Sequence, residues 1–355
     1  MAVSRIGFDG KRAMTMHNAE TLPPWLQDQL AELRGQRGHA LMLSGATGLG
    51  QYELAYALAQ VWLCERPSEQ GACGSCDGCH AVALRSHPDL HVLVPEALAP
   101  ELGWPIEAKA QDEIDKKTRK PSKWIRVDAA RAAVAFTQLT VSRAAHQVVL
   151  IHPAHRLNVE AANTLLKTLE EPPGNTRFIL ACEALHHVLP TIRSRCHIHH
   201  MRWPLAADAI EWLHRVAPNK ASPETAAVWL RAAGGRAQDA LTWAAIGLTA
   251  EQWQRLPKAI ANGDMGIMGD WPAATVLDTL QKLAHDAQAQ WVGASPRFFE
   301  AHDLPPLPHL RVLEQWALRL GDWRRSVEHP FNAGLQLEAW MTDCQQVFAP
   351  VTRSA

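Results

Sequence analysis

The sequence carries almost no net charge and contains no long apolar run. Its 35 Lys and Arg residues balance 36 Asp and Glu residues, so the formal net charge is −1. Such a chain has no global field that attracts nucleic acid or an anionic membrane, and any DNA contact must be local or shared with partners. No apolar run approaches the roughly 18–20 residues of a membrane helix. We therefore expect no membrane association and a cytoplasmic protein.

The first twenty residues lack the continuous apolar core of a signal peptide. We expect residues 1–20 to form a flexible extension, or Met14 or Met16 to be the true start. The 355 residues suffice for two or three domains with buried cores. Hydrophobic residues make up 47% and charged residues 20%, which is typical of a soluble globular protein.

A phosphate-binding loop lacks the residues that do its chemistry. The apolar run Ala40–Leu43 leads into Gly45 and Gly50, which have the Walker A spacing, and a helical pattern follows. The pattern then requires Lys and Ser or Thr, but the chain has Gln51 and Tyr52. In a working loop Lys neutralises the outer phosphates and the hydroxyl holds Mg²⁺. We therefore expect the architecture of an ATPase without the ability to use ATP.

Strands and helices alternate along the first two hundred residues. Apolar runs of strand length predict strands at Ala40–Leu43, Leu90–Val94, Val148–Ile151 and Phe178–Cys182, and we expect a fifth strand at Cys196–Met201. A 3.6-residue period predicts helices at Pro24–Leu33, Glu53–Cys64 and Val127–Leu139. This alternation indicates a parallel α/β sheet in a domain over 21–203. Residues 95–123 show no sustained period and predict a mobile surface insertion.

The character of the sequence changes after Pro204. Amphipathic helical patterns follow one another, and no strand-like run remains. Tryptophan recurs throughout this half, where packing and subunit contact are the expected roles. We predict a small helical domain over 204–248 and a helical bundle over 249–355.

Four of the seven cysteines are clustered within 64–79, at Cys64, Cys73, Cys76 and Cys79. Two residues between successive cysteines let both thiolates turn toward one ion, and four thiolates suit tetrahedral Zn²⁺. A closed shell leaves no open coordination position, so the metal is expected to be structural.

Other roles for the cysteines are less favoured. An iron–sulfur cluster would need a further cysteine where Ala81-Val82-Ala83 stands. A redox Cys-x-x-Cys pair would not need the two additional thiols. The isolated cysteines outside the cluster are expected to be core residues; they are Cys182, Cys196 and Cys344.

The third predicted strand ends without the acids of an NTPase. Such an enzyme places Asp on the magnesium and Glu on the attacking water at this point, whereas this chain has His152 and Pro153. His152 and His155 could form a metal pair, but the proline between them opposes helical spacing. We therefore do not favour a metal site there.

A helix and two arginines follow. Asn158 is expected to cap the helix, an apolar stripe to be buried, and Pro172 to end it; the stripe is Ala162, Leu165, Leu166 and Leu169. Arg193 and Arg195 precede the fifth predicted strand. Taken alone, the residues favour a surface salt-bridge pair, although an arginine can also reach a phosphate bound to a neighbouring subunit.

Three features resemble the AAA+ clamp-loader subunits of bacterial DNA polymerase III. They are the string Leu165–Pro173 (LLKTLEEPP), the Ser194-Arg195-Cys196 triplet, and the four-cysteine module inserted after the P-loop helix. The resemblance runs from Pro24 to Met201, and the helical remainder fits the family's layout. It implies a RecA-like α/β domain with an inserted zinc module, a small helical lid domain and an all-α C-terminal collar domain.

Within this family the residues resemble the delta-prime type, which does not hydrolyse ATP, more than the gamma/tau type, which does. Gln51 and Tyr52 replace the P-loop residues, His152 stands where delta-prime proteins often keep Asp, and Gln238 occupies the position of the sensor-2 Arg. The resemblance implies a non-catalytic stator that binds no ATP. It also implies that Arg195 is an arginine finger acting in trans.

The implied partners are the delta and gamma/tau subunits. Through the assembled loader, the chain would act on the sliding clamp and primer-template DNA at the replisome. One alternative is an active gamma/tau-like ATPase with unusual residues. Another is a zinc-dependent nucleic-acid binder, but Glu65, Glu69 and Asp77 do not supply the basic face it needs.

Overall fold

The computed structural model describes residues 22–36, 38–217, 221–326 and 333–349. The predicted extension at 1–20, with Met14 and Met16, lies outside these residues. The chain divides into two compact units, Met1–Pro204 and Leu205–Ala355, and each is described by itself.

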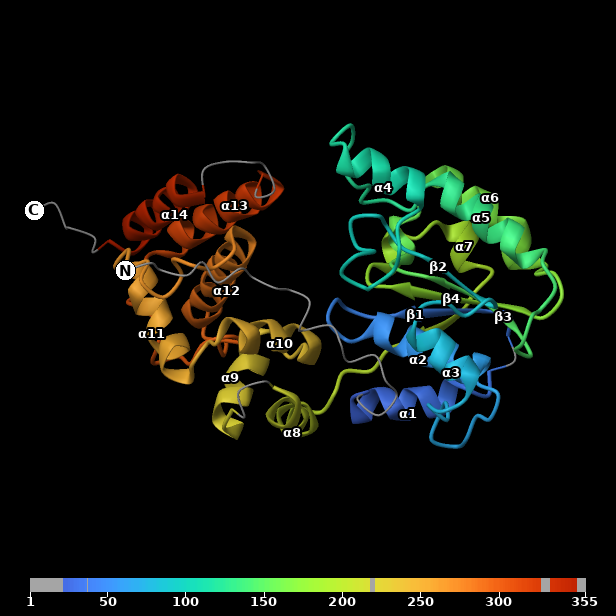
Figure 1. Ribbon diagram of the computed structural model, residues 1–355. Helices are drawn as coiled ribbons and strands as arrows, with labels where there is room; N and C mark the ends of the chain where they lie inside the picture. The colour runs from blue at the N-terminus through green and yellow to red at the C-terminus, as the bar shows by residue number, and fades with distance from the viewer. Residues whose placement is uncertain (1–21, 37, 218–220, 327–332, 350–355) are drawn as a thin grey trace, which may run out of the picture. The chain divides into compact units, whose positions relative to one another are not determined.

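The first unit is built on a parallel five-stranded sheet (Figure 1). The strand order is β2-β3-β4-β1-β5. Each strand lies where the sequence predicts one, with ends that differ by one or two residues, so the predicted parallel α/β fold is confirmed. The strands are β1 (Ala40–Ser44), β2 (Leu90–Leu93), β3 (Gln147–Ile151), β4 (Thr176–Cys182) and β5 (His197–His200).

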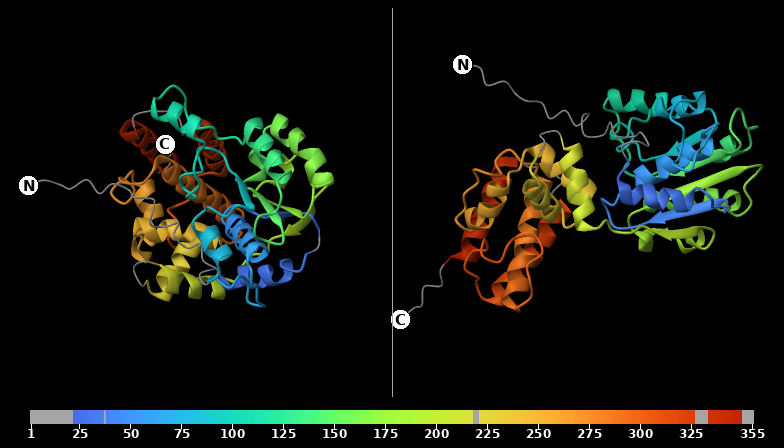
Figure 2. Two further views of the ribbon diagram at one scale, coloured as in Figure 1. Left: turned by 45° about the vertical axis from the view of Figure 1, so that its right-hand side comes forward. Right: turned by 90° about the horizontal axis from the view of Figure 1, so that it is seen from below.

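Helices cover both faces of this sheet. The first face carries α1 (Pro24–Leu33), α2 (Gln51–Leu63) and α3 (Asp77–Ala83), and the view from below in Figure 2 brings α1 and α2 in front of the strands. The opposite face carries α5 (Val127–Thr137) and α6 (Val159–Glu170). Because β1 and β3 are buried along their whole length, Ala40–Leu43 and Val148–Ile151 are continuously apolar rather than alternating.

Helix α6 follows the predicted pattern closely. The Asn158 side chain accepts a hydrogen bond from the backbone N–H of Ala161 at 2.8 Å and so caps the helix. Leu165 and Leu169 are fully buried in the core against β3 and β4, while Leu166 is only partly buried. The predicted stripe is therefore the face that packs on the sheet.

The insertion at 95–123 contains regular structure that the sequence did not predict. Helix α4 (Ala108–Asp115) lies within it. No residue of α4 is buried, so its sequence has no sustained apolar stripe at helical spacing that would reveal it. The Arg119 guanidinium bonds both Glu96 and Glu113 and ties the ends of the insertion together. The sequence pattern did not reveal this helix, and the mobility of residues 95–123 stays a prediction.

The described part of the second unit consists of helices and connecting loops (Figure 1). Trp243 packs with Trp253 and Trp271 at ring-centroid distances of 5.4 Å and 5.3 Å, which is the expected packing role. The division into 204–248 and 249–355 stays a prediction. The helices are α8 (Ala206–Val216), α9 (Pro223–Ala232), α10 (Ala237–Ile246), α11 (Ala250–Ala261), α12 (Ala273–Trp291), α13 (Leu310–Ser326) and α14 (Ala333–Phe348).

A buried carboxylate fixes the loop after α12. Asp286 is fully buried and accepts backbone N–H bonds from Arg297, Phe298 and Phe299 at 2.7–2.9 Å. The Arg297 side chain in turn donates to the Gly234 carbonyl at 2.8 Å. This network joins α12 to the turn between α9 and α10.

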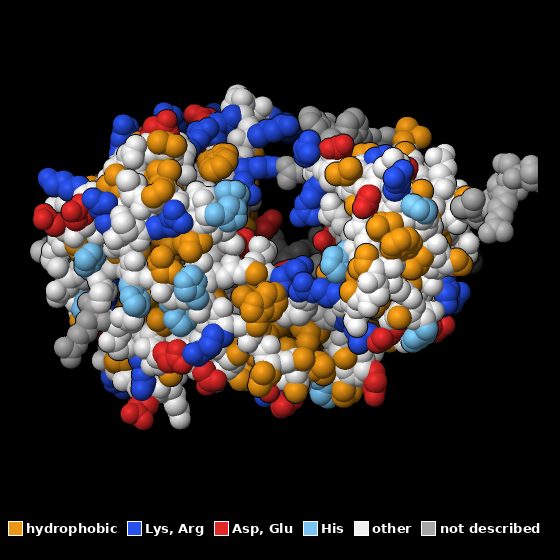
Figure 3. Space-filling model, turned by 180° about the vertical axis from the view of Figure 1, so that it is seen from behind, with side chains coloured by type: hydrophobic (Ala, Val, Ile, Leu, Met, Phe, Trp, Pro, Cys, Tyr) orange, Lys and Arg blue, Asp and Glu red, His pale blue; other side chains and the backbone are white. Residues whose placement is uncertain are grey.

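Within the described residues, no helix is long and apolar enough to cross a membrane. On the face drawn in Figure 3, basic, acidic and hydrophobic side chains are interspersed on each unit, as the small net charge predicts.

Candidate functional site

The loop between β1 and α2 keeps the backbone of a phosphate-binding loop. Gly48 and Gly50 adopt positive φ angles of 79° and 91°, a region that favours glycine. The buried Gln51 side chain turns back into the loop, where its Nε2 donates to the carbonyls of Gly45 at 2.9 Å and Ala46 at 2.6 Å. A neutral amide that binds the loop's own carbonyls thus stands where the pattern requires the phosphate-binding lysine.

Tyr52 fills the space at the start of α2. Its side chain is buried, and its Oη accepts a hydrogen bond from Trp104 Nε1 at 2.6 Å. Burial raises the pKa of the Tyr52 phenol well above its usual range, so the group stays neutral. Trp104 comes from the insertion, which therefore packs directly on the helix that follows the loop.

His152 lies at the end of β3, against Tyr52. The two ring centroids are 5.1 Å apart. Burial lowers the pKa of His152 to about 3, so its imidazole is neutral near pH 7. In an NTPase the residues at these two positions supply oxygens to one Mg²⁺ ion, whereas here two neutral rings contact each other.

The four clustered cysteines have the geometry of a tetrahedral site. The Sγ atoms of Cys64 and Cys76 are 3.9 Å apart, as are those of Cys73 and Cys79, and all four lie within 4.8 Å of one another. Zinc–sulfur bonds of about 2.3 Å at tetrahedral angles separate the sulfurs by about 3.8 Å. The four thiols therefore fit a metal ion such as Zn²⁺, with no position left for substrate.

The cysteine module is joined both within itself and to the rest of the unit. Glu65 accepts a hydrogen bond from the Gly78 N–H at 3.2 Å, and a Cβ atom on Gly78 would lie 2.7 Å from the Leu63 carbonyl oxygen. Only glycine therefore permits this approach to the end of α2. Asp77 and Arg143 form an ion pair at 3.4 Å across the unit.

Arg195 lies just before β5, with its guanidinium held by the end of α6. Its Nε and Nη2 donate to Glu170 Oε2 at 2.9 Å and 2.6 Å. Its Nη1 donates to the Thr191 carbonyl at 3.0 Å. The arginine side chain is 30% exposed, so it is ordered by its partners and still reaches the surface. The nearby Arg193 Nε is buried, with no hydrogen-bond partner among the described residues.

Comparison with known proteins decides the family. The sequence profile of the family described as "DNA polymerase III, delta subunit" matches residues 24–204. DNA polymerase III subunit delta' of Escherichia coli K12 is 30% identical over 285 residues, which is 75% of this chain and 78% of the relative. The chain belongs to the delta-prime family.

Other similarities cover different shares of the chain. The delta' subunit of Pseudomonas aeruginosa is 39% identical over 199 residues, which is 56% of this chain and 54% of the relative. The chain thus spans about half the length of that relative. A DNA polymerase III gamma subunit-related protein from Thermotoga maritima matches with a TM-score of 0.50 at 13% identity, over 91% of this chain and 99% of that one. This last likeness concerns the fold alone.

Glu183 is a site residue of this delta-prime chain that sequence reasoning missed. It directly follows β4, and its carboxylate accepts a hydrogen bond from Thr47 in the loop at 3.4 Å. A carboxylate at this place repels phosphate. Its position directly after a buried strand was the signal that could have identified it, and the last residue of that strand, Cys182, pairs with Ser44 at the end of β1.

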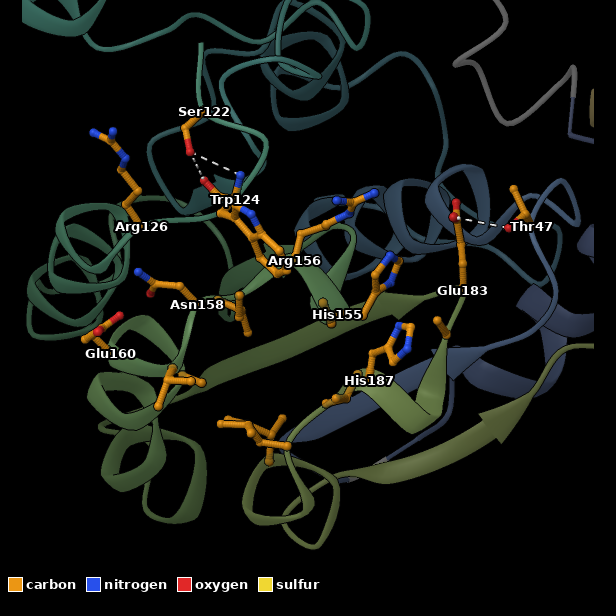
Figure 4. Close-up of a pocket in the computed structure, with 18 residues that line it drawn as sticks. Thr47, Ser122, Trp124, Arg126, His155, Arg156, Asn158, Glu160, Glu183 and His187 are labelled. Atoms are coloured by element: carbon orange, nitrogen blue, oxygen red, sulfur yellow. Dashed lines mark hydrogen bonds between the residues drawn. The ribbon is translucent and has the colours of Figure 1, made fainter. Parts of the chain in front are cut away.

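A pocket of about 1130 Å³ extends from this point in the delta-prime chain. In Figure 4 the Glu183 carboxylate points toward Thr47 at one end, while Trp124 and Arg156 lie farther along the wall. The Arg156 guanidinium lies 5.6 Å from the centre of the Trp124 ring. The pocket combines cations with the carboxylate of Glu183, so its lining is mixed in charge.

The remaining predicted residues are placed as follows. In the described part of the chain, the four cysteines form the only group of three or more metal-ligand side chains close enough to share an ion, so His152 and His155 belong to no such group. His155 instead lines the pocket. Gln238 lies in the first turn of α10, in the second unit.

Proposed function

We propose that the chain is the non-hydrolysing delta-prime subunit, or stator, of the DNA polymerase III clamp loader. In this role it binds the delta and gamma/tau subunits in the complex that loads the sliding clamp onto primed DNA at the cytoplasmic replisome. The all-α second unit would supply the lid and the collar through which the subunits assemble. Membership of the delta-prime family supports this assignment.

One observation carries the non-catalytic part of the proposal. The rings of Tyr52 and His152 are in contact at the place where an NTPase holds its magnesium ion. Both groups are neutral, and Gln51 supplies no charge. Positions 51, 52 and 152 therefore supply neither the cation for the phosphates nor an anionic ligand for the metal.

The same proposal gives Arg195 the role of an arginine finger that acts in trans. It would complete the ATP site of a neighbouring gamma/tau subunit, where such a residue contributes on the order of 10³–10⁵ in turnover. The support is its partial exposure and its ordered side chain. The chain thus acts on ATP bound by its neighbour.

The proposal also assigns Zn²⁺ to the cysteine module as a structural ion. Cys64, Cys73, Cys76 and Cys79 would hold it as thiolates. When bound, the ion supplies folding free energy to the module and takes no part in hydrolysis. The support is the match between the sulfur separations and a tetrahedral shell.

The rival is an active gamma/tau-like ATPase, and direct binding separates the two. We would measure Mg²⁺-ATP binding to the isolated chain by calorimetry, with the gamma/tau subunit as the positive control. We would then test whether the chain co-purifies with gamma/tau and delta. Absence of ATP binding together with a stable complex is expected, and tight Mg²⁺-ATP binding by the isolated chain would favour the rival.

A zinc-dependent nucleic-acid binder is the remaining alternative. The surface around the cysteines carries Glu65 and Asp77, and Asp77 pairs with Arg143, so cations there are already partly neutralised. DNA binding by the isolated chain that weakens steeply with salt would revive this function.

A further inference from the structure

The guanidinium of Arg195, the arginine finger proposed above, is held by another side chain of the same protein. An arginine stabilises a transition state only if its guanidinium is already oriented when charge develops, because reorienting a long side chain costs free energy at that moment. Arg195 has such an orienting contact in the first unit. It is made by Glu170, the last residue of α6.

The contacts divide the five N–H groups of the guanidinium into two sets. Nε and Nη2 each use one N–H on Glu170 Oε2, and Nη1 uses one on the Thr191 carbonyl. These bonds occupy three of the five donors in the fork. One N–H on each terminal nitrogen is not used by these contacts, and these two groups can donate to a phosphate.

We propose that Glu170 is the positioning residue of Arg195. It holds one side of the guanidinium so that the other end faces the phosphates of ATP on the neighbouring subunit. This inference rests on the proposed role of Arg195. Glu170 is itself held in place, because it ends a helix that Asn158 caps and that Leu165 and Leu169 fix to the sheet.

Stability alone gives a weak reason for this pair. The Glu170 side chain is 57% exposed and that of Arg195 is 30% exposed, and exposed ion pairs contribute little to folding. Substitution of Glu170 is therefore expected to leave the chain folded. If the substitution lowers ATP hydrolysis by the assembled complex, the cause would therefore be a changed orientation of the Arg195 side chain.

The test uses the complete loader, reconstituted from full-length chain, delta and gamma/tau with clamp and primed DNA. Steady-state kcat and KM for ATP would be measured with wild type, Glu170→Gln, Arg195→Ala and the double variant. Glu171→Gln is the matched control, because this neighbouring carboxylate is also exposed. The arginine-dependent rate is the difference between wild type and Arg195→Ala.

Glu170→Gln is expected to lower the arginine-dependent rate by about tenfold, by analogy with the roughly 10–100-fold loss when a residue that orients a metal ligand is replaced. KM for ATP should change by less than about twofold, because the neighbour still binds ATP. The double variant should match Arg195→Ala, since the two residues act as one unit. Glu171→Gln should behave as wild type.

The outcomes separate this inference from the function on which it rests. If Arg195→Ala leaves hydrolysis at the wild-type rate, the arginine finger itself is wrong. If Arg195→Ala lowers the rate but Glu170→Gln equals or exceeds wild type, only the positioning role is overturned, and an excess would show that Glu170 restrains the arginine.

Discussion

Substitution of one clustered cysteine is expected to unfold the metal module and leave the sheet intact. The perturbation is Cys73→Ser, which replaces a thiolate with a much weaker zinc ligand. The buried core of the module consists of Cys64, Cys76 and Cys79, with Ala72 and Cys73 partly buried against them. The module therefore has no aliphatic core of its own.

The expected loss of folding free energy in the module follows from this lack of an aliphatic core. Ordering the chain between Cys64 and Cys79 costs about 1–2 kcal/mol per residue, or on the order of 20 kcal/mol in all. A closed site of four thiolates supplies roughly 10–16 kcal/mol of apparent binding free energy. Loss of one ligand removes much of that term. The core between β3, β4 and α6 contains none of the clustered cysteines and should stay folded.

Zinc content and amide hydrogen exchange measure the effect. Wild type should hold one zinc per chain and protect residues 64–83, whereas Cys73→Ser should lose zinc and protection there while β1, β3 and β4 stay protected. Glu69→Gln, at an exposed residue of the same segment, is the control. The reasoning is refuted if the purified wild type holds no metal, or if Cys73→Ser keeps both zinc and protection.

Three further results are expected. Asp286→Ala should lower the free energy of unfolding of the second unit by about 3 kcal/mol or more, because three backbone N–H groups lose a charged acceptor; a urea midpoint equal to wild type would contradict this. Because His152 has a folded pKa of about 3, the unfolded state binds more protons than the folded state below about pH 6.5. Stability should therefore fall as pH drops from 6.5, by up to about 1.4 kcal/mol per pH unit, and His152→Leu should flatten the slope in denaturant titrations. Gln51→Lys combined with Tyr52→Thr should give no ATP turnover by the isolated chain, since no carboxylate stands at 152 or 153; measurable hydrolysis would show that the acids are dispensable.

The parallel sheet could be predicted because two of its central strands, β1 and β3, are buried along their whole length. Ala40–Leu43 in β1 and Val148–Ile151 in β3 are therefore continuously apolar and stand out from the helical periods around them. Helix α4 could not be found in this way, since none of its residues is buried. Helix α3 could not be predicted either. It is short and begins among the cysteines, where the glycines and the cysteine spacing indicate turns around a metal rather than a helix.

The site was predictable in its residue types but not in its contacts. The replacement of Lys by Gln51 and of an acid by His152 can be read from spacing alone. The contact of Tyr52 with Trp104 joins positions 52 residues apart in the sequence, and that of Arg195 with Glu170 joins positions 25 apart. Such pairs arise from the tertiary fold, and no local pattern in a single sequence specifies them.

The central claim is that the chain does not turn over ATP and instead supplies Arg195 to a neighbour. The most direct measurement is DNA-stimulated ATP hydrolysis by the reconstituted loader, with wild-type chain and with Arg195→Ala. The account predicts that Arg195→Ala assembles normally and abolishes hydrolysis at one neighbouring site, which lowers both total hydrolysis and clamp loading. Normal hydrolysis and normal clamp-loading rates with Arg195→Ala would contradict it.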